Sequence, residues 1–414
     1  MKNINSIKPE ILAPAGDFVS LQAAIDAGAD AVYFGIGAFN MRSGSTLNFT
    51  INDLEEIALR AKGRVKLYLT LNTIIFEDEL AQVENLIVSA KDYVDAFIVS
   101  DWGVISLCKK YGVAIHASTQ LSTSNSLAVD FLRSQGVSRV VLARECTLEE
   151  VSRITASSKM EIECFVHGAQ CLAHSGRCLM SHVAFGKSAN RGQCLQPCRR
   201  RFAVRAVEEG GVDVAPGRDN VEFMLEGHTI LSAKDLCSIG FVDKLVEAGI
   251  KCFKIEGRAR NANYVRACVL AYRRAVDAVF NGDFTRELVM ELTKDLEKVF
   301  HREFSEGLFY GRPGVGLTTD SEDSLATTLK RHVGVVVDYF AKAGVAQIKV
   351  QDSSMSKGDC VQIHGNTTGV VELVVGEMRR DEETVDIAER GSWVTMPAPK
   401  CRRGDKVFLI CDIN

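Results

Sequence analysis

The chain has 414 residues, of which 46% are hydrophobic and 25% are charged, and it contains only 7 prolines. This composition is typical of a globular protein, and the length exceeds one simple domain, so we expect two domains or one large barrel with an appendage. The formal net charge of −4 excludes a protein whose whole surface is basic, so any surface that binds anions has to be local.

The N-terminal stretch MKNINSIKPEILAPAG lacks the apolar core and the cleavage pattern of a signal peptide. No apolar run reaches the roughly 18 residues that a membrane-spanning helix requires. We therefore expect a cytoplasmic protein without a membrane partner. Disulfides are disfavoured in that reducing compartment, so a cluster of cysteines there points to metal or redox chemistry.

Short apolar strands alternate with amphipathic helices along most of the chain. Stretches such as LQAAIDAGAD and DLEEIALRAKG carry apolar residues at helical spacing, and several of these stretches end at glycine. Strands that alternate with helices predict a parallel sheet, and eight such units favour a (β/α)8 barrel of the TIM type. The predicted strands are 10–16, 31–36, 65–72, 96–101, 114–120, 139–145, 162–168 and 251–258.

The regular spacing is broken once, between the seventh and the eighth predicted strand. More than 80 residues separate these strands, and they contain a cysteine-rich insertion at about 169–250. An insertion after the C-terminal end of a barrel strand lies on the face where barrel active sites form. We therefore expect the chemistry of the protein at this insertion.

The pattern changes again near residue 331, where short alternating segments follow one another with glycine-containing turns and no helical spacing. Such a pattern predicts a small all-β domain, which we expect to be a β-barrel used for binding or subunit contact. The expected division is a (β/α)8 barrel over 1–325 and the β-barrel domain over 326–414.

Five cysteines of the insertion are candidate metal ligands. Six residues separate Cys171 from Cys178, 15 more precede Cys194, three lie between Cys194 and Cys198, and 42 lie between Cys194 and Cys237. Four thiolates can bind zinc or an iron–sulfur cluster. Because only Cys194 and Cys198 have the close spacing of structural zinc sites, the pattern favours iron–sulfur, with zinc and a metal-free set of thiols as alternatives.

The run E-x-F-x-x-G-A-x-C-x(6)-C-x-x-S, from Glu163 to Ser181, resembles the signature of the collagenase-like U32 peptidases. ILAPAGD, NRGQCLQPCR, SAKDLC, KIEGR and REFSEG match that family in the expected order, and the β-rich tail resembles its C-terminal domain. Despite the peptidase name, the resemblance implies an oxygen-independent hydroxylation factor that holds a [4Fe–4S] cluster. One branch of the family acts on ubiquinone precursors and others act on tRNA uridine or ribosomal RNA, with prephenate implicated in the RNA branches.

Position by position, the resemblance implies that Cys171, Cys178, Cys194 and Cys237 bind the cluster. The branches differ over the last ligand, so Cys198 is the alternative to Cys237. The resemblance also leaves open a partner subunit of the same family.

Several polar side chains are expected to face the interior of the barrel. Glu163 and His167 lie two strand steps apart, and His116 and Gln120 share one face with Ser118. Buried polar groups are costly unless they meet a ligand or each other, so Glu163, His167, His116 and Gln120 are candidate catalytic residues. A buried, hydrogen-bonded pair is the structural alternative for Glu163 and His167.

The candidate substrate-binding residues are polar and lie at strand ends or in basic stretches. From Cys171 to Arg205 the chain has seven basic residues and no acidic one, and Lys251 to Arg274 has seven against one. Either stretch can be a solvated face, but neutralisation of the phosphates of a polyanion would explain both. Three adjacent arginines cannot all reach one pocket, so we expect them to contact phosphates. The candidates are Asn72, Arg144, Arg191, Arg199, Arg200, Arg201, Glu256 and Arg258.

These observations favour an iron–sulfur-dependent, oxygen-independent hydroxylase of RNA, most simply of tRNA uridine. The alternatives are a collagenase-like peptidase and a ubiquinone-precursor hydroxylation factor. The sequence has no G-x-S-x-G elbow and no H-E-x-x-H helix, and Cys164 with His167 offers only a loose nucleophile pair. A small quinone precursor does not explain the basic stretches, so RNA is the expected partner.

Overall fold

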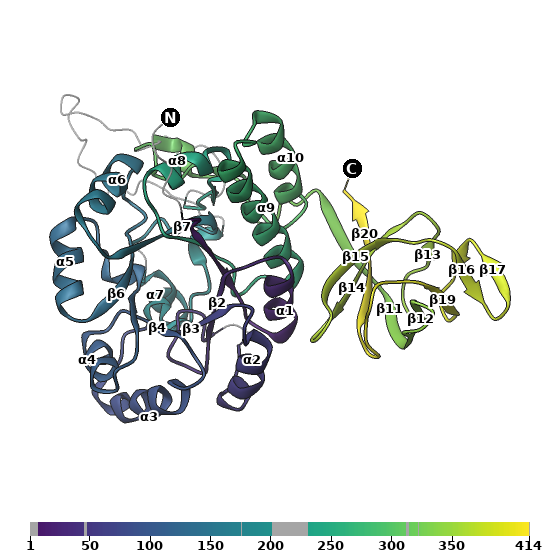
Figure 1. Cartoon of the computed structure of the whole chain (residues 1–414), viewed down its shortest axis with the longest axis horizontal. Helices are drawn as coiled ribbons and strands as arrows, with labels where there is room; N and C mark the ends of the chain where they lie inside the picture. The colour runs from purple at the N-terminus through teal and green to yellow at the C-terminus, as the bar shows by residue number, and fades with distance from the viewer. Residues whose placement is uncertain are drawn as a thin grey trace, which may run out of the picture.

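A computed structural model describes residues 7–44, 48–174, 176–200, 231–311, 314–321 and 323–413. Within these residues eight parallel strands close into a barrel, because β9 pairs with β1 on one side and with β7 on the other (Figure 1). This confirms the predicted (β/α)8 class. The barrel strands are β1 (Glu10–Pro14), β2 (Ala31–Gly35), β3 (Lys66–Leu71), β4 (Ala96–Val99), β5 (Ile115–Ala117), β6 (Val137–Val141), β7 (Glu161–Gly168) and β9 (Cys252–Ile255).

Helices surround the barrel, and several begin at a side chain that caps free backbone N–H groups. Asp17 accepts a hydrogen bond from the Ser20 amide at 2.7 Å, and Asn125 accepts one from the Ala128 amide at 2.9 Å. Apolar faces of these helices pack on the strands. The helices are α1 (Phe18–Asp26), α2 (Leu54–Ala61), α3 (Leu80–Ala90), α4 (Trp102–Lys110), α5 (Ser126–Ser134), α6 (Leu148–Ser157), α8 (Val242–Glu247), α9 (Ala262–Asn281) and α10 (Arg286–Glu297).

The barrel interior contains charged side chains as well as apolar ones. Arg139 Nη1 lies 2.6 Å from Glu10 Oε1, and Lys254 Nζ lies 2.7 Å from Glu163 Oε1. The Tyr68 hydroxyl donates to Glu10 at 2.9 Å. Each buried charge thus has an opposite charge beside it, as burial in a low-dielectric interior requires.

The cysteine-rich insertion follows β7. Its described part contains α7 (Met180–Phe185), the 3-10 turns η4 (Ala189–Arg191) and η5 (Pro197–Arg199), and strand β8 (Asp235–Cys237). β8 runs antiparallel to β7 and pairs with β10 (Phe304–Ser305), so the sheet extends past the barrel at this edge. Neither β8 nor β10 follows from the alternation that predicts the barrel strands.

The C-terminal part is all-β, as predicted. In the described residues its main sheet has the antiparallel order β15-β14-β20-β11-β12-β19-β16-β17. The expected barrel shape stays a prediction. The strands are β11 (Thr328–Phe340), β12 (Val345–Val350), β13 (Met355–Ser356), β14 (Cys360–Gly365), β15 (Gly369–Val374), β16 (Met378–Arg380), β17 (Glu383–Val385), β18 (Ile387–Ala388), β19 (Trp393–Pro397) and β20 (Lys406–Asp412).

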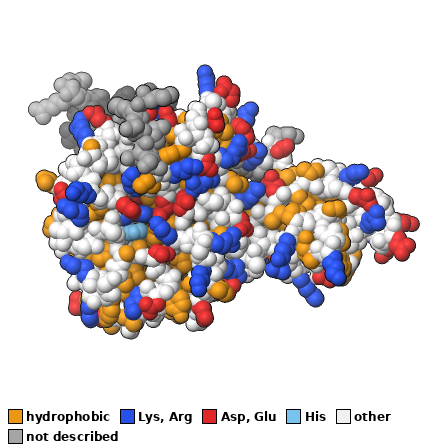
Figure 2. All heavy atoms as spheres, in the orientation of Figure 1, with side chains coloured by type: hydrophobic (Ala, Val, Ile, Leu, Met, Phe, Trp, Pro, Cys, Tyr) orange, Lys and Arg blue, Asp and Glu red, His pale blue; other side chains and the backbone are white. Residues whose placement is uncertain are grey.

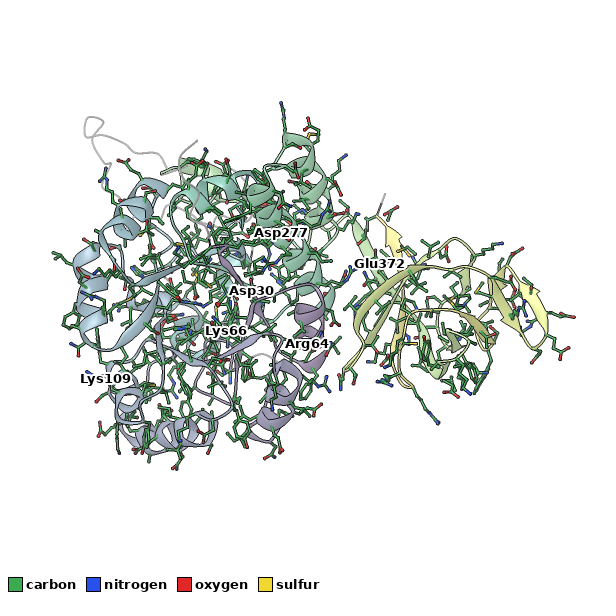
Figure 3. The ribbon with its side chains drawn as sticks, in the orientation of Figure 1. Asp30, Arg64, Lys66, Lys109, Asp277 and Glu372 are labelled. Atoms are coloured by element: carbon green, nitrogen blue, oxygen red, sulfur yellow. The ribbon has the colours of Figure 1, made fainter. Side chains whose placement is uncertain are left out.

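The C-terminal sheet contacts the barrel through α1 and α9. Val370 on β15 packs with Ala23 and Ala262. Gln362 on β14 donates to Asn263 on α9 at 2.9 Å and to Glu372 at 2.7 Å, and Glu372 is labelled in Figure 3. The boundary near residue 325 stays a prediction.

The surface seen in Figure 2 intersperses acidic and basic side chains, in keeping with the small net charge. None of the helices in the described part of the chain combines the length and apolar composition that crossing a bilayer requires.

Candidate functional site

Three arginines and one glutamate meet at the carboxyl ends of the barrel strands, and we call this set the mouth. Arg42 comes from the loop after β2, Arg144 follows β6, and Glu256 and Arg258 follow β9. Arg42 Nη2 lies 2.6 Å from Glu256 Oε1. Burial alone would raise the pKa of Glu256, but the charges of the three guanidiniums lower it to about 2, so the carboxylate stays ionised.

The mouth has more positive than negative charge, because three guanidiniums surround a single carboxylate. Arg258 Nη1 donates to Thr70 Oγ1 at 2.7 Å, and burial lowers the pKa of Arg258 to about 10. Arg144 Nη1 donates to the Ala169 carbonyl at 2.7 Å. The Nε atoms of Arg144 and Arg258 are buried and have no hydrogen-bond partner in the described residues. An anion at the mouth would balance the excess positive charge.

A group of uncharged polar side chains lies beside the arginines. Asn72 donates to Ser118 Oγ at 3.3 Å, and Ser118 in turn donates to Gln120. The Asn72 carbonyl oxygen accepts from the Met41 amide at 3.2 Å, next to Arg42. The structure therefore brings together Asn72 and Gln120, which the sequence places at the ends of two different strands.

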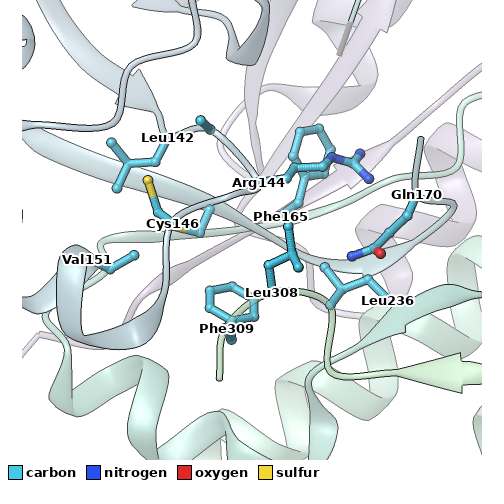
Figure 4. A pocket seen from close by; sticks show the side chains of 11 residues that line it. Leu142, Arg144, Cys146, Val151, Phe165, Gln170, Leu236, Leu308 and Phe309 are labelled. Atoms are coloured by element: carbon cyan, nitrogen blue, oxygen red, sulfur yellow. The ribbon is translucent and has the colours of Figure 1, made fainter. Parts of the chain in front are cut away.

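Next to Arg144 is a small cavity of about 10 Å³, room for roughly one water molecule. Figure 4 shows Arg144 beside Phe165, with Gln170, Leu236 and Cys146 around the cavity. The Arg144 guanidinium lies 4.1 Å from the centre of the Phe165 ring. The cavity is too small for a substrate.

Four cysteines of residues 169–200, which we call the cysteine segment, lie within electrostatic reach of one another. Burial raises the pKa of the Cys198 thiol, and the charges of Cys171, Cys194 and Cys178 raise it further. Burial also raises the pKa of Cys171, with added contributions from Cys178 and Cys194. All four are free thiols.

The fifth candidate, Cys237, lies apart from these four. It is buried on β8, opposite His167 on β7, and burial raises its pKa to about 11. Its neighbours are Tyr272 and Cys268 of α9. The side chain of Cys237 thus faces α9, so the placement favours Cys198 as the fourth member of the group.

The donor set of the cysteine segment fits an iron–sulfur cluster, since four thiolates are the usual ligands. In the described part of the chain no three His, Cys, Asp or Glu side chains are arranged as ligands of one metal ion. The segment adjoins the mouth, because Ser43 Oγ, next to Arg42, donates to the Arg191 carbonyl at 2.9 Å and the Gly44 amide donates to the Gly192 carbonyl at 3.0 Å. Cys194 lies within electrostatic range of Arg42, and Cys171 within that of Arg144.

The predicted phosphate-binding arginines have different surroundings. Arg191 pairs with Glu79, with Nη1 to Oε2 at 2.6 Å, and so ties the cysteine segment to the loop after β3. Arg199 is buried and donates to the carbonyls of Ala233 and Gln170 and to Ser232, so it is not available to a phosphate. The expectation that the three adjacent arginines bind phosphates together therefore fails at Arg199.

Arg200 remains as an exposed arginine of that triplet, with its guanidinium 4.8 Å from the Phe185 ring centre. Arg201 lies outside the described residues. Of the three adjacent arginines, Arg200 thus faces solvent and can contact a phosphate.

Glu163 and His167 do not share a face as predicted. Glu163 faces the barrel interior and pairs with Lys254, whereas His167 lies against Tyr272, Tyr264 and Phe304. The reason is a shift in strand register between Phe165 and His167, which turns the histidine toward α9.

Both candidate histidines are neutral in the folded protein. Burial, with a smaller contribution from His301, lowers the pKa of His167 to about 3. Burial and the nearby Arg139 also hold the pKa of His116 well below its ordinary value. The His116 ring lies 4.6 Å from the ring of Tyr68 inside the barrel, and its Nδ1 atom has no partner among the described residues.

Sequence analysis missed Arg42 and its neighbour Asn40. Both lie in the loop after the second strand, on the face where barrel active sites form. That rule, applied to every loop following a strand, would have selected Arg42.

The profile of Peptidase family U32 matches residues 16–319 of the chain. The chain is 39% identical over 421 residues to a collagenase of Porphyromonas gingivalis, with 98% of each chain covered. It is 33% identical over 384 residues to the tRNA hydroxylation protein P1 of Bacillus subtilis, covering 91% of this chain and 89% of that one. It is also 33% identical over 345 residues to the 23S rRNA 5-hydroxycytidine C2501 synthase of Escherichia coli, covering 81% of this chain and 50% of that one. The protein belongs to peptidase family U32.

Proposed function

We propose that the protein hydroxylates RNA without molecular oxygen, most directly a tRNA uridine, and that Cys171, Cys178, Cys194 and Cys198 hold a [4Fe–4S] cluster for this reaction. Two relatives named for tRNA and rRNA hydroxylation align with most of the chain. The observation that carries the proposal is the juxtaposition of four thiols with a mouth of excess positive charge.

The mouth is suited to a small molecule with two carboxylates, and prephenate is the one that the family resemblance implicates. Arg42, Arg144 and Arg258 bring three guanidiniums together with one carboxylate, which leaves positive charge for a carboxylate ligand. Glu256 stays ionised at neutral pH and holds Arg42 at 2.6 Å, so the third guanidinium is fixed before the ligand arrives. Asn72 and Gln120 offer amide groups beside these charges.

A bound cluster would supply electron transfer next to this site. The candidate histidines do not serve as proton donors at neutral pH, because burial keeps His116 and His167 uncharged. Glu163 is committed to Lys254 in the barrel interior. The part of the chain's own residues that we assign to the reaction is therefore binding and orientation at the mouth.

Peptidase activity is the second candidate, favoured by the relative named collagenase. A cysteine peptidase requires a thiol activated by a neighbouring base. Burial raises the pKa of Cys164 well above its ordinary value, and His167 faces α9 with a pKa of about 3. Cys164 and His167 therefore lack the properties of such a pair.

Nucleoside mass spectrometry of tRNA and ribosomal RNA from a strain lacking the gene tests the proposal. Loss of one hydroxylated pyrimidine, restored by the wild-type gene, is the expected result. An unchanged set of nucleosides would reject RNA hydroxylation. Cleavage of a gelatin substrate by the purified protein would then favour the peptidase, and an altered quinone pool would favour the ubiquinone-precursor alternative.

A further inference from the structure

Asn40 is a fully buried polar residue that contacts two parts of the mouth. Its Oδ1 atom accepts from Arg258 Nη1 at 3.0 Å and from the backbone amide of Arg42 at 3.1 Å. Its Nδ2 atom donates to the Gly37 carbonyl at 3.0 Å, which fixes the orientation of the amide. The Asn40 side chain thus binds the guanidinium of Arg258 and the backbone amide of Arg42.

The same residue is in close contact with the cysteine segment. Gly192, two residues before Cys194, has a φ of +79°, and a Cβ atom at that position would lie 2.1 Å from the Asn40 carbonyl oxygen and 2.6 Å from Ser43 Oγ. The Gly44 amide donates to the Gly192 carbonyl at 3.0 Å, and Ser43 Oγ donates to the Arg191 carbonyl at 2.9 Å. Only glycine permits this approach of two backbones.

We infer that Asn40 is a positioning residue that couples the cysteine segment to the arginines of the mouth. A shift of Gly192 displaces the Asn40 backbone, and a shift of Asn40 moves the acceptor that Arg258 and the Arg42 loop share. The inference rests on the proposed function, since it takes the mouth as an anion site and the cysteine segment as the cluster site. Coupling is reciprocal, so an anion at the mouth and a cluster at the cysteines stabilise each other.

The rate at which a chelator removes iron from the anaerobically purified full-length protein measures this coupling. Prephenate should slow the loss of iron from the wild-type protein several-fold. In Gly192→Ala the added methyl group separates the two loops, so prephenate should give no protection. Gly186→Ala is the matched control, because Gly186 also has a positive φ, of +66°, but nothing lies within 4 Å of its Cβ position.

A second variant tests Asn40 itself. Asn40→Asp keeps an acceptor for Arg258 but replaces the donor to the Gly37 carbonyl with a negative charge at the mouth. Its affinity for prephenate should fall about tenfold or more and its melting temperature should fall as well, with iron content near that of the wild type. If Gly192→Ala fails to retain iron at all, the prephenate affinity of the iron-free proteins replaces the rate measurement. Affinity should then be reduced in Gly192→Ala and unchanged in Gly186→Ala.

The inference would be overturned if prephenate protected the iron of Gly192→Ala as well as that of the wild type. It would also be overturned if both glycine variants lost this protection equally, or if Asn40→Asp bound prephenate with unchanged affinity. A wild-type protein that holds iron and restores the RNA modification, yet gains no protection from prephenate, would overturn this inference alone. A wild-type protein without iron, in cells whose RNA does not depend on the gene, would instead overturn the proposed function.

Discussion

Arg42 and Glu256 form an ion pair of 2.6 Å that joins the loop after β2 to the end of β9 across β1, the strand between them. The same loop contacts the cysteine segment, where the Gly44 amide donates to the Gly192 carbonyl at 3.0 Å. The loop after the second strand, the end of the last strand and the cysteine segment therefore meet at one place. The following predictions test what each of these parts contributes.

Cys198 and Cys237 should respond oppositely to substitution. Cys198→Ala should lose its iron, because this thiol lies with Cys171, Cys178 and Cys194. Cys237→Ala should keep about four irons per chain, because its thiol faces α9. Iron, sulfide and visible absorption of anaerobic preparations measure this, with Cys268→Ala as a control for a buried thiol. Iron retained in Cys198→Ala and lost in Cys237→Ala would return Cys237 to the ligand set.

Arg199 and Arg200 are adjacent in sequence and should differ in their effects. Arg199→Ala removes the donor to the buried Ala233 carbonyl and to the part-buried Gln170 carbonyl and should lower the free energy of unfolding by about 2–3 kcal/mol. Arg200→Ala should leave stability unchanged and lower the salt dependence of RNA binding by about 0.7–0.9 in log–log slope. Denaturant unfolding and RNA titrations at several salt concentrations measure the two effects. A slope unaffected by Arg200→Ala would remove this arginine from the RNA contact.

Glu163 was predicted to be catalytic, and its pairing with Lys254 allows a sharp test. Glu163→Gln removes the carboxylate charge from a buried ammonium and should cost about 3–5 kcal/mol of stability. Glu163→Leu combined with Lys254→Met removes both charges and should regain most of that loss. We expect the double variant to hydroxylate RNA as the wild-type protein does. Regained stability without hydroxylation would instead assign a catalytic role to the pair of Glu163 and Lys254.

The buried histidines should make the protein sensitive to acid. His167 and His364 each have a pKa of about 3 in the folded protein, mainly because of burial, against an ordinary value of 6.5. Below pH 6.5 these histidines bind protons in the unfolded chain but not in the folded protein. The free energy of unfolding therefore has its full value above pH 6.5 and falls as pH decreases toward 3. At pH 5 each histidine should lower the free energy of unfolding by about 2 kcal/mol. His364→Gln should therefore reduce the difference in unfolding free energy between pH 7 and pH 5 by about 2 kcal/mol, and an unchanged difference would mean that His364 does not titrate in this range.

The barrel could be predicted because its signals are local and repeat eight times. Each strand is a short apolar run and each helix has its own spacing and cap, so no single error changes the class. Strand β6 shows the limit: it spans Val137–Val141 and not 139–145, since the apolar pattern continues past the strand into the loop that carries Arg144. The strand order of the C-terminal sheet could not be predicted, because it depends on pairing between distant strands.

The site was harder to predict because it depends on the directions of individual side chains. His167 has the right spacing to share a face with Glu163, but a register shift turns it away. Cys237 fits the ligand spacing, yet β8 directs it toward α9. Arg199 belongs to a basic run, but it is buried and donates to carbonyls that only the fold brings near it. Asn72 and Gln120 lie side by side because each follows the end of a barrel strand.

Complementation with a variant that has no cluster tests the central claim most directly. Cells lacking the gene receive either the wild-type protein or Cys171→Ala at equal abundance, and their RNA nucleosides are measured by mass spectrometry. The account predicts that the wild type restores the hydroxylated pyrimidine and that Cys171→Ala does not. Restoration by Cys171→Ala, with iron shown to be absent from it, would contradict the account and indicate a non-catalytic RNA-binding or assembly factor.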